Sequence, residues 1–238
     1  MNIGIVTIAY NGYGRFLPQW CRAIAELTRL PAAVTVALGK DHGATPEMIA
    51  EARRHVPILQ IVDAGDTPST MGAMRNVAVE HTAAEWIMYL SVDDAILPHA
   101  IEEFERYEHQ ADYICIRWLT RGLGKKEIEH VPKLPIEMAT KYRGRGFIVG
   151  HSPFRRRFWE KAPYEPHDYP NAPFLASMVE NAARFVRTER PCTVYQRRSD
   201  SHSRGILFKS RTEKRKAIHY KREMQRRIVG YYEYQRYE

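Results

Sequence analysis

The sequence predicts an α/β fold in which a mostly parallel sheet is flanked by helices. Apolar runs of strand length alternate with helical patterns through about residue 95, and the connections between them are short. Such continuous apolar runs are typical of strands buried on both faces. Regular alternation of strand and helix predicts parallel strands joined by right-handed crossovers.

The first half of the chain supplies most of this pattern. Thr45-Pro46 is typical of a helix start, because Thr caps the first turn and Pro suits the first helical position. Pro18 begins an earlier helix for the same reason. The elements expected here are strands at 3–9, 34–38, 58–62 and 86–90, and helices at 18–30, 46–55 and 70–81.

The pattern weakens in the second half. Gly122 and Gly124 indicate a hairpin or loop. The other elements expected are helices at 98–110, 154–161, 173–184 and 211–232, and strands at 113–119, 147–149 and 192–195.

Composition narrows the class of protein. No run approaches the roughly 18–20 apolar residues of a membrane span. The N-terminus has no basic region before its apolar run, so we do not expect a signal peptide. The three cysteines are far apart, which fits neither a zinc site nor a disulfide framework. We therefore expect a cytoplasmic protein whose C-terminal segment also allows peripheral attachment to a membrane surface.

Charge is concentrated at the C-terminal end. Residues 204–238 contain eleven Lys and Arg against four Asp and Glu, a net charge of +7 out of +8 for the whole chain. An amphipathic pattern runs through about 211–232. We interpret residues 206–238 as a basic helical tail, which predicts an acidic partner such as DNA or an anionic membrane, or packing against the body.

Two adjacent carboxylates, Asp93 and Asp94, follow the apolar run at 86–90. Ligand sites in open α/β sheets lie outside the carboxyl ends of such strands. Adjacent carboxylates repel each other, and a divalent cation relieves that repulsion. A simple Asp-Asp turn is the alternative.

Other polar residues are expected near the same edge. The first strand ends in Thr7-Ile8-Ala9-Tyr10-Asn11, and Met74-Arg75-Asn76 lies on the helix before the fourth strand. Tyr195–Ser203 is a polar segment late in the chain. Together with Tyr89–Asp94 and Pro98, these segments resemble, in order and spacing, the motifs of nucleotide-sugar-dependent glycosyltransferases of the GT-A fold, especially family-2-like enzymes.

The resemblance covers about residues 3–205 and implies a GT-A-type Rossmann-like sandwich. It divides a catalytic domain, 1–205, into a nucleotide-sugar half at about 1–95 and an acceptor half at about 96–205. Ser91 stands where the family often has a further Asp. The resemblance therefore implies that Asp93 and Asp94 hold Mn²⁺ or Mg²⁺, with His202 as a third ligand or a phosphate contact.

The resemblance also implies donor contacts and a base. The nucleotide-sugar would contact Thr7, Ala9, Tyr10, Asn11, Asp41, Asp63, Arg75, Ser91 and Asp93. Asp168 is the expected catalytic base, with Glu165 as the alternative.

The predicted function is metal-dependent transfer of a sugar from a UDP- or GDP-sugar to an acceptor hydroxyl. The base implies inversion. A glycan, a lipid-linked glycan or a modified DNA base would serve as acceptor. Two alternatives remain: a nucleic-acid-binding protein that uses its basic, Tyr-rich tail, and a nucleotidyltransferase.

Overall fold

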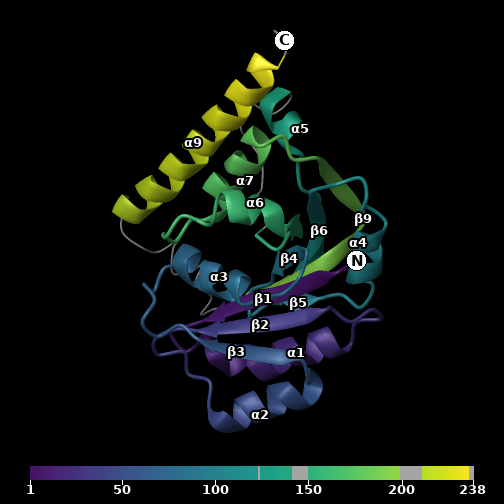
Figure 1. Ribbon diagram of the computed structural model, residues 1–238, viewed down its shortest axis with the longest axis vertical. Coiled ribbons are helices and arrows are strands. Elements are labelled where there is room, and N and C mark those ends of the chain that lie inside the picture. Colours follow the sequence, from purple (N-terminus) through teal and green to yellow (C-terminus); the bar gives the residue numbers. More distant parts are fainter. Residues whose placement is uncertain (123, 141–149, 199–210, 236–238) are drawn as a thin grey trace.

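The computed structural model describes residues 1–122, 124–140, 150–198 and 211–235. Its strands form one sheet in the order β3-β2-β1-β4-β8-β6-β9-β5, and β7 pairs with β6 outside this order. Helices cover both faces of the sheet (Figure 1). The predicted α/β sandwich is therefore confirmed.

The N-terminal half is the parallel part of the sheet. Strands β1 to β4 pair in parallel, with β1 between β2 and β4. The side chains of Thr45 and Thr70 each accept a hydrogen bond from the first turn of the helix that follows. The elements are β1 (Ile3–Ala9), η1 (Tyr13–Phe16), α1 (Leu17–Ala25), β2 (Ala33–Leu38), α2 (Pro46–His55), β3 (Leu59–Asp63), α3 (Met71–Glu80) and β4 (Trp86–Tyr89).

The C-terminal half extends the sheet with mixed pairings. Strand β9 runs parallel to β6, whereas β5, β7 and β8 pair antiparallel. The elements are β5 (Ala95–Ile96), α4 (Ala100–Glu105), β6 (Tyr113–Gly122), β7 (Lys125–His130), α5 (Pro135–Thr140), β8 (Phe154–Arg155), α6 (Arg156–Lys161), α7 (Asn171–Glu180), β9 (Phe185–Gln196) and α9 (Arg211–Tyr234).

Several element boundaries differ from the sequence prediction. Helix α1 ends at Ala25 rather than at 30, and α4 covers Ala100–Glu105 rather than 98–110. The helix expected at 154–161 begins with the short strand β8 before α6. Helix α7 ends at Glu180 rather than at 184, because Ala182 takes the left-handed conformation (φ 56°) and turns the chain. Strand β9 then begins at Phe185 rather than at 192, because its whole length pairs with β6. The strand predicted at 147–149 lies outside the described residues.

The sheet separates two hydrophobic clusters. Trp20 and Ile24 of α1 and Phe104 of α4 pack in the first cluster. Met74 of α3 and Met224 of α9 belong to the second. Burying an apolar side chain of this size stabilises the fold by about 1.5–3 kcal/mol. The amphipathic C-terminal helix therefore covers part of the core.

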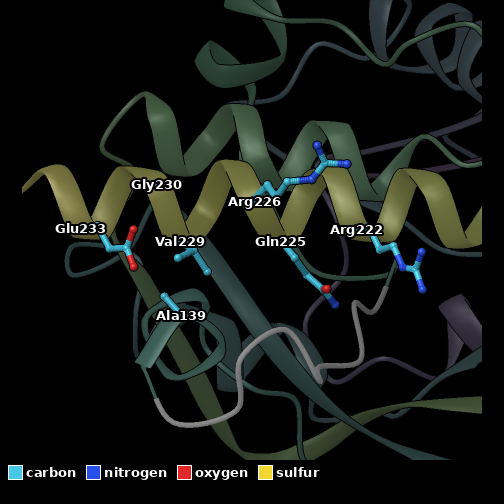
Figure 2. A pocket seen from close by; sticks show the side chains of 7 residues that line it. All are labelled: Ala139, Arg222, Gln225, Arg226, Val229, Gly230 and Glu233. Atoms are coloured by element: carbon cyan, nitrogen blue, oxygen red, sulfur yellow. The ribbon is translucent and has the colours of Figure 1, made fainter.

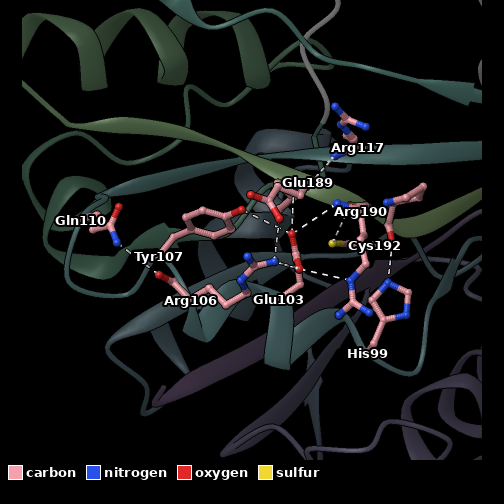
Figure 3. A network of polar contacts seen from close by, with 11 residues as sticks. His99, Glu103, Arg106, Tyr107, Gln110, Arg117, Glu189, Arg190 and Cys192 are labelled. Atoms are coloured by element: carbon pink, nitrogen blue, oxygen red, sulfur yellow. Dashed lines mark hydrogen bonds and ion pairs between the residues drawn. The ribbon is translucent and has the colours of Figure 1, made fainter.

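A buried carboxylate joins α4 to β9. Glu103 is fully buried and accepts hydrogen bonds from the amides of Glu189 (2.8 Å) and Arg190 (3.3 Å). The guanidinium groups of Arg106 and Arg190 converge on the same carboxylate (Figure 3). This network fixes β9, whose end reaches the site described next.

Candidate active site

The carboxyl ends of the parallel strands meet at one edge of the sheet. The amide of Gly39, just after β2, donates to the main-chain oxygen of Ala9 (2.8 Å). The amide of Leu90, just after β4, donates to that of Val6 (2.9 Å). The loops that follow β1, β2 and β4 therefore lie together, as open α/β sheets require of a ligand site.

The loops after β1 and β2 are locked together by their backbones. The amide of Gly12 donates to the main-chain oxygen of Asp41 (2.7 Å). Asn11 and Asp41 both take the left-handed conformation, with φ of 49° and 52°, which Asn and Asp tolerate better than most residues. Both side chains are exposed at this edge.

Asp63 ends β3 at the outer side of the same edge. Its Oδ1 accepts a hydrogen bond from the amide of Gly65 (2.8 Å), which closes a local turn. The side chain is exposed. Asp63 therefore stabilises a local turn, and its side chain stays exposed to solvent.

Asp94 is held from two sides. Only 5% of Asp94 is exposed. Its Oδ1 accepts a hydrogen bond from the amide of Gln196 at the end of β9 (2.8 Å). Its Oδ2 lies 3.2 Å from Nε2 of His151. Strand β9 and His151 together fix the orientation of this carboxylate.

Asp93 occupies a different electrostatic environment. Burial and the neighbouring charge of Asp94 raise the pKa of Asp93 to about 6. The guanidinium of Arg198 opposes this effect, and its Nη2 donates to the main-chain oxygen of Asp93 (3.4 Å). A cation or a proton near Asp93 therefore stabilises the folded protein.

His151 is a site residue that sequence reasoning missed. Its Nε2 lies 3.1 Å from Oγ of Ser91, in addition to its contact with Asp94. Its ring also contacts that of Tyr89, with centroids 6.3 Å apart. His151 lies far from Asp94 in the sequence and has no ligand spacing, so no local pattern marks it.

Arg75 lies beneath this edge. It is 3% exposed, and its guanidinium lies 3.6 Å from the ring centroid of Tyr89. It also donates to Oδ1 of Asn171 on α7. Its neighbour Asn76 bonds to Trp159 and to the backbone of Tyr164. Both α3 residues thus join α3 to the C-terminal half.

Asp168 lies at the beginning of α3. Its Oδ1 accepts a hydrogen bond from the amide of Met71 (3.3 Å). Burial raises the pKa of Tyr10, and the charges of Tyr89 and Asp168 raise it further. Glu165 is more exposed, and its Oε2 lies 3.1 Å from Nε2 of His167.

Three buried polar atoms near these elements have no hydrogen-bond partner among the described residues. They are Oγ1 of Thr7 on β1, Nε of Arg75 on α3 and Nε of Arg198 after β9. Buried polar groups in folded proteins are nearly always paired. Their state fits a site that a polar ligand completes.

Ala9 and His202 are among the predicted site residues that are not seen as side chains exposed at this edge of the sheet. Ala9 is fully buried within β1, so a ligand would meet its backbone. His202 lies outside the described residues. Within the described ranges, no three His, Cys, Asp or Glu side chains form a metal-binding group. Nor does any helix of that part of the chain have the length and apolar character to cross a membrane.

A groove of about 610 Å³ lies along α9 (Figure 2). Two of its residues, Arg222 and Arg226, are exposed and form no ion pair with any described residue. Glu233 lies at the far end of the groove. The lining residues are Ala139, Arg222, Gln225, Arg226, Val229, Gly230 and Glu233.

The central sheet and its flanking helices are consistent with a GT-A-like glycosyltransferase fold. Among solved structures, the chain is similar to S. aureus TarS, a glycosyltransferase. It matches residues 1–349 of TarS with a TM-score of 0.65 and 14% identity, over 82% of this chain and 60% of that one.

Two complexes of the same TarS fragment match as well. The complex with UDP-GlcNAc has a TM-score of 0.66 and 14% identity, over 85% of this chain and 60% of that chain. The complex with UDP has a TM-score of 0.62 and 14% identity, over 83% and 61%. This chain thus spans about three fifths of the TarS fragment. No family model and no curated protein matches the chain.

Proposed function

We propose that this protein is a nucleotide-sugar-dependent glycosyltransferase. The observation that carries the proposal is that Asp93 and Asp94 follow β4, which pairs in parallel with β1. They therefore lie at the same edge of a GT-A-like sheet as the loops after β1 and β2. That edge offers carboxylates to hold a metal ion beside the diphosphate. It also offers exposed polar side chains to bind the nucleoside. The complexes of TarS with UDP-GlcNAc and UDP support a uridine nucleotide as the donor.

The nucleoside would bind over β1 and β2. Asn11 and Asp41 offer exposed hydrogen-bonding groups on a rigid backbone. Asp63 offers a further carboxylate for the base or ribose. A rigid loop loses little entropy when it binds a ligand, which favours this placement.

A divalent ion, Mn²⁺ or Mg²⁺, fits the acidic pair. Asp93 and Asp94 would supply oxygen ligands, and the raised pKa of Asp93, caused by burial and the charge of Asp94, supports a positive charge at this position. His202 remains a candidate third ligand. When bound, the ion neutralises charge on the departing diphosphate. His151 and Gln196 keep Asp94 in one orientation for that role.

Asp168 is the proposed base. The amide of Met71 at the start of α3 holds its Oδ1, and the charge of Asp168 contributes to the raised pKa of Tyr10. In this role it removes the proton from the acceptor hydroxyl, which implies inversion at the sugar carbon. Glu165 is the alternative, although its carboxylate pairs with His167.

The groove along α9 favours an anionic acceptor. Arg222 and Arg226 are one helical turn apart and lack a described ion-pair partner, so a phosphate or carboxylate fits between them. Lipid-linked glycans and DNA both carry phosphates. The same charge would keep the protein at an anionic surface.

A screen of nucleotide sugars for Mn²⁺-dependent hydrolysis tests the function without knowledge of the acceptor. We expect UDP-sugars to be hydrolysed, and Asp93→Asn to abolish the reaction. Glu102→Gln, an exposed change on α4, is the matched control. The proposal fails if no nucleotide sugar is hydrolysed and neither UDP nor GDP with Mn²⁺ raises the unfolding temperature.

A further inference from the structure

The loop of residues 165–169, which carries Asp168, is held on its inner side by α3. The amide of Gly72 donates to the main-chain oxygen of His167 (3.0 Å). A Cβ added at Gly72 would lie only 1.8 Å from the main-chain oxygen of Glu165. The backbones therefore approach as closely as glycine permits.

The outer side of the same loop is covered by α9. The ring of Tyr220 stacks on that of His167, with centroids 4.1 Å apart and an interplanar angle of 23°. It also stacks on the ring of Tyr169, at 5.9 Å and 30°. His167 and Tyr169 are the two sequence neighbours of Asp168. Tyr220 thus contacts the loop on both sides of the proposed base.

Helix α9 is itself firmly attached at this point. Met224 and Ile228, which follow Tyr220 at helical spacing, are 2% and 1% exposed. Nε and Nη2 of Arg227 donate to the two carboxylate oxygens of Glu180 on α7, at 2.6 and 2.5 Å. Tyr220 therefore projects from an anchored helix.

We infer that Tyr220 is a positioning residue: through His167 and Tyr169, it holds the loop that presents Asp168 to the acceptor. The inference rests on the proposed function for the role of Asp168. It assigns α9 a part in the reaction itself, beyond any attraction for acidic partners. A loop held on one side only samples more orientations, and small misplacements of a base are costly in rate.

Hydrogen exchange of the full chain tests the contact without reference to activity. Tyr220→Ala should increase amide exchange in residues 165–169 at least tenfold relative to the wild type. Tyr220→Phe keeps the stacked ring, so the amides of residues 165–169 should stay as protected as in the wild type. Ile218→Ala, an exposed change two residues earlier on α9, is the matched control. Equal exchange in Tyr220→Ala and Ile218→Ala would overturn the inference.

Kinetics then test the catalytic consequence. Tyr220→Ala should lower kcat about tenfold. Its KM for the donor and its affinity for UDP should stay within twofold, because Tyr220 is not assigned a contact with the nucleotide. A fall in affinity equal to the fall in kcat would show general loosening and would overturn the positioning role.

The two hypotheses fail in different ways. If the wild type neither binds nucleotides nor hydrolyses their sugars, the proposed function fails, even where the exchange data show that Tyr220 holds the loop. If the wild type is active and Tyr220→Ala is equally active, the positioning inference fails alone.

Discussion

His151 and Asp94 are in direct contact, with Nε2 and Oδ2 separated by 3.2 Å. The contact joins the segment before β8 to the acidic pair after β4. Because the amide of Gln196 holds the other oxygen of Asp94, the carboxylate has one preferred orientation. Groups that orient a metal ligand typically change metal affinity by one to two orders of magnitude.

Replacement of His151 by Ala should therefore weaken Mn²⁺ binding in the presence of UDP by about tenfold. Titration calorimetry measures this affinity directly. His109→Ala, on an exposed residue outside the site, should leave it unchanged. An unaltered Mn²⁺ affinity in His151→Ala would show that β9 alone orients Asp94.

Asp93→Asn should change stability and ligand binding in opposite directions: it should stabilise the metal-free protein and weaken the binding of Mn²⁺ and UDP. The substitution removes a partly buried charge next to the buried Asp94, so the metal-free protein should become more stable by roughly 1–3 kcal/mol. The same variant should lose the rise in unfolding temperature caused by Mn²⁺ and UDP. Thermal unfolding with and without these ligands measures both effects, and a metal-free variant less stable than the wild type would contradict the electrostatic account.

Asp168→Asn should lower kcat by about 10²–10⁴-fold, as expected for loss of a general base. The amide oxygen still accepts the bond from Met71, so donor affinity should be retained. Glu165→Gln is the comparison variant, because it tests the other candidate. A severe loss in Glu165→Gln with little change in Asp168→Asn would reverse the assignment.

Charge reversal in the α9 groove tests the anionic acceptor. The double change of Arg222 and Arg226 to Glu should weaken binding of an anionic oligomer at least tenfold and reduce the salt dependence of that binding. Reversal of Arg53 and Arg54 on α2 makes the same change in net charge elsewhere. Equal losses in the two double variants would show that only overall charge matters.

The Glu103 carboxylate, which joins α4 to β9, should make the free energy of unfolding fall at acidic pH. Burial alone would raise the pKa of Glu103, but two amides and two guanidinium groups outweigh it and hold the pKa below its ordinary value of 4.5. A depressed pKa stabilises the fold above the unfolded pKa, and this contribution is lost as pH falls below about 4.5.

Replacement of Glu103 by Ala should cost about 2–4 kcal/mol at pH 7, because the amides of Glu189 and Arg190 lose their acceptor. Urea unfolding at pH 7 and at pH 3.5 measures the effect. The gap between variant and wild type should narrow at the lower pH. A constant gap would show that packing, not charge, dominates.

Local sequence patterns were sufficient to predict the strands and helices of the parallel half of the fold. The apolar runs of β1, β2 and β4 are buried strands, whereas β3 at the edge of the sheet is partly exposed. Asp93 and Asp94 do follow the fourth strand. The predicted cap at Thr45 marks a helix start. These features depend on hydrophobic periodicity and capping chemistry, which involve residues close together in the chain.

Contacts between residues far apart in the chain could not be predicted from local sequence patterns. His151 carries no spacing signal, and it reaches Asp94 only because β8 inserts antiparallel beside β4. The full length of β9 was also missed, since its first half has few apolar residues and is stabilised by pairing with β6. Long-range pairing of this kind leaves no periodic signature.

The sequence by itself determined that an acidic pair follows a buried strand, and that the C-terminal segment is an amphipathic basic helix. Only the tertiary structure decided what each of them contacts. Asp94 is held by His151 and Gln196, and the apolar stripe of α9 packs into the second core, with Tyr220 against His167. The physical reason is that an amphipathic pattern specifies which face of a helix is buried but not which surface covers it.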